Sequence, residues 1–406
     1  MIYCNKERME EKINTFARFG DTGRGGITRL SLSASALEAR QEVLKRCEKL
    51  CMDVKMDDMA NIYATLKGEE GLPAILMGSH LDSVIRGGNY DGILGVLTAL
   101  EVIETIVIEK IKHRHPITLV IWTNEEGARF DPAMMSSGVV CQKFDKEKML
   151  KSMDTEGISF EEALEKSGYK GTIDNRMNPK DSLAFLELHI EQGPVLEAEK
   201  KDIGIVEGVC GMVNYEFSCY GQADHAGTTP MKYRKDALYA ATKVIQYLHD
   251  ELDCLDNKLV YTTGRIVASP NIHTIIPDEV RFTLDARHQD TKVIDQVVEI
   301  INRVPKEVVG CQVKYQELWS RKTVTFHKLY VDYVEKNAKQ CGYSAMRIYS
   351  GPGHDAQFVS DVVPTTMIFV PSIKGHSHCE KEYTPMENCW KGANVMLQTV
   401  LDIDLL

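Results

Sequence analysis

Apolar residues along much of the chain form short continuous runs and helix-length segments with an apolar face. Continuous runs of this length are typical of strands buried on both faces of a sheet, and alternation with helices favours a largely parallel sheet. The pattern therefore predicts an α/β domain. Strands are expected within residues 72–80, 116–124, 182–193 and 363–372, and helices within residues 40–50, 92–110, 326–342 and 387–401.

The pattern changes near residue 211, where apolar and polar residues begin to alternate as in half-solvated strands. The order strand, helix, two strands, helix, strand is that of a compact α+β unit of the split βαβ kind. We therefore predict a main domain of residues 1–211 and 325–406, interrupted by an inserted domain of residues 212–324. The inserted elements are expected within residues 213–221, 236–252, 258–268, 279–288, 291–308 and 311–318.

Composition excludes several classes of protein. The 406 residues are 43% hydrophobic and 26% charged, which is typical of a globular chain rather than a disordered one. The net charge of −11 makes nucleic acid and anionic membranes poor partners. No apolar stretch approaches the roughly 20 residues that span a bilayer. Eleven cysteines without a CxxC pair, together with a start that does not resemble a signal peptide, predict a reduced, cytoplasmic protein.

The first candidate for chemistry lies in the stretch GSHLDSVIRGGNYDG, residues 78–92. His80 ends a predicted buried strand, where α/β proteins place their sites, and Asp91 precedes the next helix. An imidazole with carboxylates suits Zn²⁺ or a similar divalent ion, and Asp82 could hold the other ring nitrogen of His80. Taken alone, the stretch also fits a capped helix start beside an ordinary strand-end histidine.

Other strand ends carry similar residues, each with an ordinary alternative. Glu125 and Glu126 follow the second strand. Two adjacent acids repel each other, so they need a cation or separate roles, unless the pair simply lies in a solvated loop. His189 lies in the third strand, where a packed core histidine is the common case. His376 and His378 follow the last strand, in what could equally be a surface loop.

The joint placement of these groups is more informative than any one of them. Strand ends of one sheet meet in space, so the groups could converge. Five ligands fit two metal ions bridged by one carboxylate, which leaves Glu125 as a general base. The converging ligands would be His80, Asp91, Glu126, His189 and His378.

These residues, in this order, resemble the M20 metallopeptidase clan and, more narrowly, its hydantoinase/carbamoylase amidase family. The resemblance runs nearly end to end. It rests on the motifs GSHLDS, GGNYDG, TNEEGARF, LELHIEQGPVLE, ADHAGTTPM and SGPGHDA. It implies a phosphorylase/hydrolase-like di-metal catalytic domain of α/β class. It also implies that residues 212–324 form a ferredoxin-like lid, through which the protein forms a homodimer.

The resemblance also implies a two-metal centre. One ion would be held by His80, Asp91 and His189, and a second by Asp91, Glu126 and His378, with Asp91 bridging. The same ligands accept Zn²⁺, Mn²⁺, Co²⁺ or Ni²⁺, so the sequence does not identify the metal. Glu125 would take a proton from the attacking water and pass it to the leaving nitrogen, and Asp82 would orient His80 from outside the ligand set.

Further roles follow from the same resemblance. His225 of the inserted domain would reach the partner subunit's active site and stabilise the oxyanion. Arg287 would bind the substrate carboxylate with its planar fork. Gln192 and His354 match positions that line the substrate pocket. The substrate would be a small anion with a ureido group.

The chain departs from the family pattern in the loop NIHTIIPDEV, residues 271–280. Family members usually have asparagine where this chain has Thr274 and glycine where it has Asp278. Asn271 is close in sequence but does not align. A substrate contact at Asn271 or Thr274 is therefore in question. Cys379, next to His378, is interpreted as a wall of the pocket rather than as a metal ligand.

The resemblance favours a metal-dependent amidohydrolase that acts on N-carbamoyl-L-amino acids. Allantoate amidohydrolase and β-ureidopropionase are the alternatives within the family, and Arg287 lies in an RHQD motif that allantoate enzymes share with some carbamoylases. A dipeptidase or aminoacylase of the clan is disfavoured, because those enzymes usually have an acid where His189 stands. A non-catalytic dimeric binding protein is disfavoured because every ligand position and Glu125 are filled.

Overall fold

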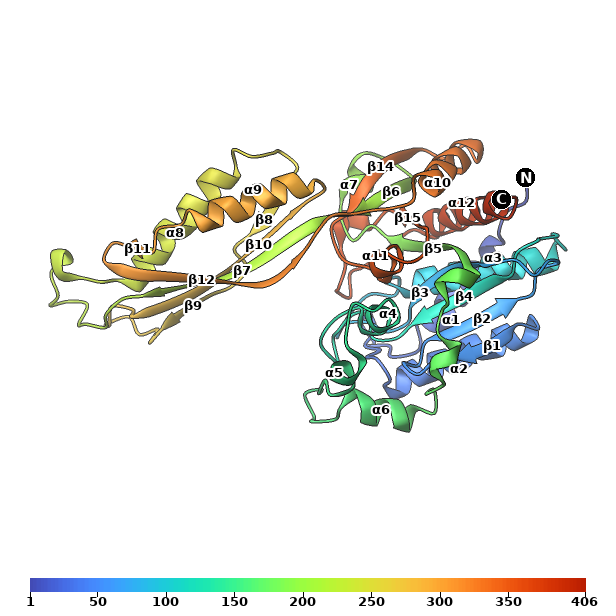
Figure 1. Cartoon of the computed structure of the whole chain (residues 1–406), viewed down its shortest axis with the longest axis horizontal. Coiled ribbons are helices and arrows are strands. Elements are labelled where there is room, and N and C mark those ends of the chain that lie inside the picture. Colours follow the sequence, from blue (N-terminus) through green and yellow to red (C-terminus); the bar gives the residue numbers. More distant parts are fainter. The chain divides into compact units, whose positions relative to one another are not determined.

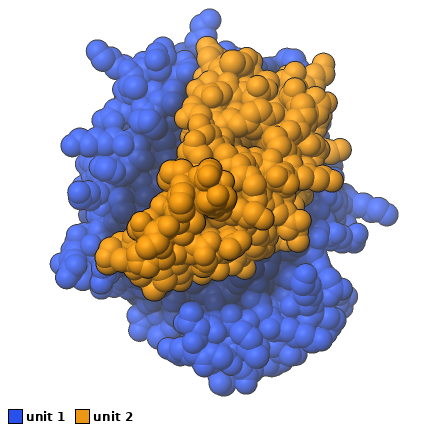
Figure 2. Space-filling model, turned by 90° about the vertical axis from the view of Figure 1, so that its left-hand side faces the viewer, with its two compact units in different colours: residues 1–208, 325–406 blue, residues 209–324 orange.

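The computed structural model describes residues 1–406, which fold into two compact units (Figure 2). Unit 1 comprises Met1–Gly208 and Thr325–Leu406, and unit 2 comprises Val209–Val324. None of the helices combines the length and apolar character that crossing a membrane requires.

Unit 1 is built around a nine-stranded sheet in the order β1-β2-β4-β3-β5-β15-β6-β13, with β14 paired to β6 (Figure 1). Its four central strands, β4, β3, β5 and β15, run parallel, while β1 is antiparallel to β2, β2 to β4, and β6 to β15. The strands are β1 Asp53–Met56, β2 Ile62–Leu66, β3 Ala74–His80, β4 Ile117–Trp122, β5 Ser182–Ile190, β6 Ile203–Val209, β13 Val324–Thr325, β14 Ala345–Ser350 and β15 Thr365–Val370.

The parallel strands explain the continuous apolar runs. Every residue of β4 and β15 is buried, because helices and loops cover both faces of the sheet. The register pairs His80 with Trp122 and His189 with Phe369, so the carboxyl ends of the strands share one edge. Groups that follow these strands are thereby brought to one place, as expected from the sequence.

Helices complete unit 1. Helix α3 is buried on nearly all sides, because it packs on β3, β4 and β5 while α1 and α12 cover its other side. The helices are α1 Lys6–Phe16, α2 Ala34–Lys49, α3 Ile93–Ile108, α4 Met135–Val140, α5 Lys146–Leu150, α6 Phe160–Ser167, α7 Val195–Ala198, α10 Lys328–Gln340, α11 Asp355–Val359 and α12 Met386–Ile403, with 3-10 turns at Ile173–Asn175, Pro179–Asp181 and Ile373–Gly375.

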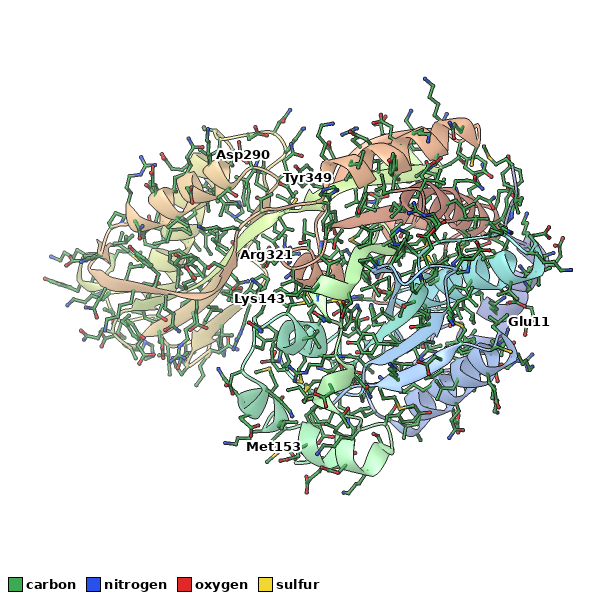
Figure 3. All side chains as sticks on the ribbon, turned by 45° about the vertical axis from the view of Figure 1, so that its right-hand side comes forward. Glu11, Lys143, Met153, Asp290, Arg321 and Tyr349 are labelled. Carbon is green, nitrogen blue, oxygen red and sulfur yellow. The ribbon has the colours of Figure 1, made fainter.

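Unit 2 is an antiparallel sheet in the order β11-β12-β7-β10-β8, with β9 also paired to β10. The alternating residues of β7 and β10 bury one face of the sheet in a core with α8 and α9. Asp290, labelled in Figure 3, caps α9 by accepting a hydrogen bond from the N–H of Lys292. The elements are β7 Gly211–Tyr220, α8 Ala237–Leu252, β8 Val260–Thr262, β9 Ile266–Ser269, β10 Glu279–His288, α9 Thr291–Asn302, β11 Glu307–Val308 and β12 Cys311–Arg321, with a 3-10 turn at Met231–Tyr233.

Two elements of unit 2 differ from the sequence-based expectation. The single strand expected within residues 258–268 is two short strands, β8 and β9, separated around Gly264 and paired to different halves of β10. The helix expected to reach residue 308 ends at Asn302. Pro305 follows closely and disfavours helical backbone before it, so Glu307–Val308 instead begins a hairpin with β12.

Candidate metal centre and active site

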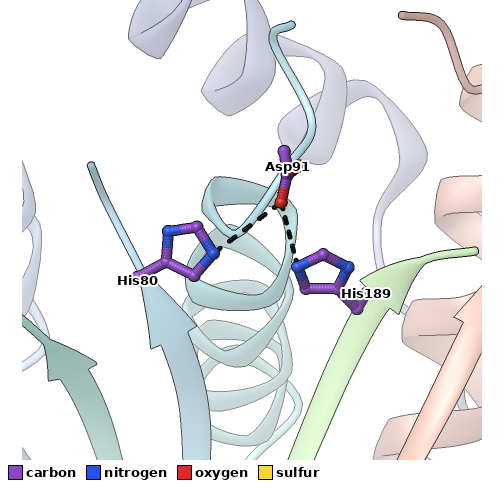
Figure 4. A group of neighbouring side chains, drawn as sticks. All are labelled: His80, Asp91 and His189. Carbon is purple, nitrogen blue, oxygen red and sulfur yellow. Dashed lines mark ion pairs between the residues drawn. The ribbon is translucent and has the colours of Figure 1, made fainter. Parts of the chain in front are cut away.

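Two histidines and one aspartate meet where the parallel strands of unit 1 end. His80 is the last residue of β3, His189 lies near the end of β5, and Asp91 lies in the turn before α3. Figure 4 shows both imidazoles directed at the Asp91 carboxylate. The Nε2 atoms of His80 and His189 are 3.7 and 3.1 Å from Oδ1 of Asp91. All three side chains are buried.

The other ring nitrogen of each histidine faces a backbone carbonyl. Nδ1 of His80 lies 2.9 Å from the carbonyl oxygen of Asp82, and Nδ1 of His189 lies 2.9 Å from that of Ile190. A carbonyl can only accept, so both Nδ1 atoms carry a hydrogen, and the Nε2 atom of each ring is the one that faces Asp91. This orientation leaves Nε2 as the atom with which each histidine would bind a metal.

A second group shares Asp91. Nε2 of His378 lies 3.3 Å from Oδ2 of Asp91 and 3.3 Å from Oε2 of Glu126. The potential ligand atoms within each group of three lie within 4.8 Å of one another, which suits one ion per group. Because Asp91 offers a different oxygen to each group, its geometry is that of a bridging carboxylate. Glu126 Oε1 is buried without a hydrogen-bond partner, as expected of an atom left for another ligand.

The turn before α3 depends on glycine. Gly92 adopts a φ of 65°, and a Cβ atom there would lie 2.2–2.3 Å from the ring of His80. Only glycine tolerates both the left-handed backbone and this close approach. Gly92 therefore allows the imidazole of His80 and the carboxylate of Asp91 to share one turn.

Glu125 lies beside the first group, with Oε2 3.5 Å from Nε2 of His80. The carboxylate of Asp82 accepts hydrogen bonds from the N–H groups of Glu125 (3.3 Å) and Glu126 (3.2 Å). Asp82 therefore orients His80 mainly through its carbonyl, while its carboxylate holds the turn that carries both glutamates. Asn124 precedes this turn in the left-handed conformation, at φ 60°.

Burial and charge perturb the acids of the site in opposite directions. Burial raises the pKa of Glu125 well above its usual range, and the negative charges of Asp355 and Glu126 raise it further. Burial and the charge of Asp91 do the same to the pKa of Glu126. Burial alone would also raise the pKa of Asp91, but hydrogen bonds from His189 and His378 outweigh it and hold that pKa well below normal. Asp91 is thus favoured as an anion, and Glu125 as a group that accepts and releases a proton.

The two other predicted residues of unit 1 also lie at this centre. Nε2 of Gln192 donates to Oδ2 of Asp91 at 2.8 Å, and Gln192 adopts a φ of 58° after β5. His354 is buried, with Nε2 2.8 Å from Oγ of Ser350 and its ring centroid 4.5 Å from that of His189.

Unit 2 brings three predicted residues together at one end. His225 forms an isolated β-bridge with Ile275, and the N–H of Ala226 donates to the carbonyl of Thr274 at 2.9 Å. Asn271, Thr274 and His225 are all exposed. Nδ1 of His225 accepts from the N–H of Gly227 at 3.0 Å, so Nε2 carries the hydrogen and is a donor.

Arg287 lies at the opposite end of unit 2. Its Nε donates to Oδ1 of Asp285 at 2.7 Å, and the side chain is 35% exposed. Glu279, at the other end of β10, pairs with Tyr220, and the chain continues from there to His225. Eight residue steps of about 3.4 Å separate Glu279 from Arg287, so about 27 Å of strand lie between Arg287 and the end of β10 at which the chain leads to His225.

The structure adds residues to the site that sequence patterns did not single out. Glu382 is buried and accepts hydrogen bonds from the N–H groups of Tyr90 and Asp91. Ser377 lies 3.2 Å from Asp91 Oδ2. Buried Glu187 accepts hydrogen bonds from Ser79 and Ala356. Glu382 and Ser377 carry no signal in the sequence, because glutamate and serine are common in loops and their partners are distant. Glu187 lies within the apolar run of β5, and that position is the one cue that the sequence offers for it.

The chain is similar over nearly all of its length to known proteins. Residues 76–402 match the model of peptidase family M20/M25/M40. An N-carbamoyl-L-amino-acid amidohydrolase of Rhizobium meliloti is 36% identical, over 98% of this chain and 96% of that protein. An allantoate amidohydrolase of Bacillus subtilis is 33% identical, over 93% of each.

A solved structure gives the same result. An amidase of the hydantoinase/carbamoylase family from Burkholderia multivorans is 36% identical, with a TM-score of 0.94 over 100% of this chain and 99% of that one. The expected mixed α/β fold is thereby confirmed. On sequence and fold alike, the chain belongs to peptidase family M20/M25/M40 and, within it, groups with the hydantoinase/carbamoylase amidases.

Proposed function

We propose that this protein is a metal-dependent amidohydrolase that cleaves the C–N bond of an N-carbamoyl (ureido) group on a small carboxylic acid. The observation that carries the proposal is Asp91, which offers one oxygen to His80 and His189 and the other to His378. Relatives named as amidohydrolases on non-peptide C–N bonds support the same reaction class. N-carbamoyl-L-amino acids are the preferred substrates in this proposal.

The centre would hold two divalent ions, which when bound supply an activated water and polarise the ureido carbonyl. Glu125 stands 3.5 Å from a ligand nitrogen of His80, close enough to exchange protons with a reactant at the centre. It takes the proton of the attacking water on Oε2 and returns it to the leaving nitrogen. Its raised pKa makes the Glu125 carboxylate a stronger base for taking up that proton.

The inserted unit would act as lid and dimerisation domain. Its strand order, with β7 and β10 central and both helices on one face, supports a ferredoxin-like arrangement. Arg287 would bind the substrate carboxylate, and Asp285 keeps its guanidinium oriented for that. His225, with the hydrogen on Nε2, would donate to the oxyanion.

The distance between these two residues supports a homodimer. A ureido acid is far shorter than the roughly 27 Å along β10, so one chain cannot place both His225 and Arg287 on the same molecule. We propose that each active site takes Arg287 from the chain that supplies the metal ligands and His225 from the partner.

Allantoate is the second candidate substrate, because the Bacillus subtilis relative at 33% identity is named for it. The deciding experiment is a kinetic panel with the metal-reconstituted protein. It compares kcat/KM for N-carbamoyl-L-amino acids, allantoate, 3-ureidopropionate and dipeptides. The proposal expects the highest value for a carbamoyl amino acid. Hydrolysis of dipeptides alone would refute it.

A further inference from the structure

Glu382 links two parts of the metal centre without contributing a metal ligand. It lies in the loop after β15, the same loop that carries His378, and is 4% exposed. Its Oε1 accepts hydrogen bonds from the N–H groups of Tyr90 and Asp91, both at 3.0 Å. The turn that presents Asp91 is therefore fixed to the loop that presents His378.

The second carboxylate oxygen of Glu382 serves the same centre. Oε2 lies 3.2 Å from the hydroxyl of Ser377, which also lies 3.2 Å from Oδ2 of Asp91. The single hydroxyl hydrogen can go to either carboxylate. Both carboxylate oxygens of Glu382 are thus connected to Asp91. One accepts from the backbone N–H of Asp91, and the other contacts Ser377, which in turn contacts the Asp91 carboxylate.

The neighbouring turn is shaped to admit this side chain. A Cβ atom on Gly88 would lie 2.1 Å from Oε1 of Glu382, so the carboxylate occupies space that only glycine leaves open. No left-handed backbone requires glycine there, since the φ of Gly88 is not positive. The close approach of Glu382 is the feature that demands it.

The second ion position depends on this link more than the first does. His80 and His189 lie in or at the ends of buried strands, whereas the His378 side chain is 51% exposed and comes from a loop. A backbone hydrogen bond from Glu382 N–H to the carbonyl of Cys379, at 3.0 Å, closes the turn that directly follows His378. Glu382 therefore anchors the exposed ligand of the second position to the bridging carboxylate.

We propose that Glu382 is a positioning residue that holds Asp91 and His378 at bridging distance and so sets the affinity of the second metal position. The inference rests on the two-ion centre of the proposed function. Residues that orient metal ligands typically change affinity by about 10- to 100-fold when they are removed. The role requires the length and the acceptor oxygen of the side chain rather than its charge.

The test is calorimetric titration of the metal-stripped protein with Mn²⁺. Wild-type protein is expected to bind two ions. Glu382→Gln keeps the acceptor and the length and should bind both ions nearly as wild type does. Glu382→Asp keeps the charge but is too short, and Gly88→Ala displaces the carboxylate. Both should weaken the second ion by about 10- to 100-fold and spare the first.

Matched controls separate this role from general damage. Gly71→Ala places a Cβ where no atom lies within 4 Å, and Glu387→Gln removes an equal charge from an exposed side chain. Both should bind two ions normally, and unfolding temperatures in chelator should show that every variant is folded. Wild-type affinity for the second ion in Glu382→Asp and Gly88→Ala would overturn the inference. Weakened binding of the second ion in Glu382→Gln, with wild-type affinity in Glu382→Asp, would also overturn it, since charge rather than length would then be responsible. A wild-type protein that binds fewer than two ions would refute the two-ion centre itself, and the inference with it.

Discussion

The proposed division of each active site between two chains makes a quantitative prediction about mixed dimers. His225→Ala should remove the oxyanion donor and Arg287→Ala the carboxylate clamp, so each homodimer should lose most of its activity. In a dimer of one His225→Ala chain with one Arg287→Ala chain, both substitutions affect the same active site. The other active site keeps its own Arg287 and receives an intact His225 from the partner.

The magnitude follows from the symmetry of the dimer. A mixed dimer with one intact site of two should have about half of wild-type activity. Random exchange of equal amounts makes about half of all dimers mixed, so the mixture should recover about one quarter of wild-type activity. The structural basis is the roughly 27 Å of β10 that separate Arg287 from the end at which the chain leads to His225, because one chain cannot then complete a site for so small a substrate.

The assay uses two affinity tags, so that mixed dimers are purified and their composition is verified. Activity is measured as release of ammonia from a carbamoyl amino acid at saturating metal. A mixture of two His225→Ala preparations carrying the different tags controls for effects of exchange. Verified mixed dimers with no more activity than either parent would refute the shared site. A monomeric wild-type protein with full activity would refute it as well.

Three further outcomes are expected. Glu125→Gln should lower kcat by about 10²- to 10⁴-fold, because the amide cannot take up the proton. Elemental analysis should find the metal content of this variant unchanged. Loss of metal would contradict the assignment of Glu125 as a base rather than a ligand. Chelation should abolish activity and lower the unfolding temperature, both reversed by added Mn²⁺ or Zn²⁺, because the ions bind only the folded centre; an unchanged unfolding temperature would count against the centre. Glu101→Gln should destabilise the fold by about 2 kcal/mol in urea unfolding, because buried Lys12, 2.7 Å from Glu101 Oε2, loses one carboxylate partner and keeps only Glu104 at 2.6 Å. Burial opposes ionisation of Glu101, but Arg8 and Lys12 outweigh burial and lower the pKa of Glu101. The stability that ionised Glu101 contributes is therefore present above the ordinary glutamate pKa and is lost as pH falls through the lowered pKa. Equal acid sensitivity of wild type and variant would refute the assignment of this stability to Glu101.

Much of the fold could be predicted from the sequence because its strongest elements have unambiguous periods. Strands β3, β4, β5 and β15 are continuous apolar runs that only a sheet covered on both faces accommodates. The ligands follow these strands directly, so their convergence could be expected before any geometry was known. The family resemblance then assigned a role to each residue, which spacing alone could not do.

The remainder depended on contacts between distant segments. Asp82 shows the limit, since its position two residues after His80 suggested a carboxylate–imidazole pair. The structure places the backbone carbonyl there and directs the carboxylate to the N–H groups of Glu125 and Glu126. Glu382 is 291 residues from Asp91 in sequence, and a glutamate in a polar loop gives no hint of burial. Short strands such as β8 and β9 depend on pairing with β10 more than on their own pattern.

The centre gathers several carboxylates in a protein whose net charge is already −11. These carboxylates offer more acceptor oxygens than their own hydrogen bonds satisfy, and the charge of the centre explains why. Asp91 has histidine neighbours that favour its anion, whereas burial and mutual repulsion keep Glu125 and Glu126 protonated to a higher pH than usual. Glu126 also leaves an oxygen buried without a partner. Such a site is costly for folding alone, since a buried acid without a partner cation loses its hydration. Divalent ions remove the repulsion, so the arrangement is better explained by ligand binding than by stability. The negative charges therefore select cations for the centre, and in the proposed function Arg287 would supply the positive charge that an anionic substrate needs.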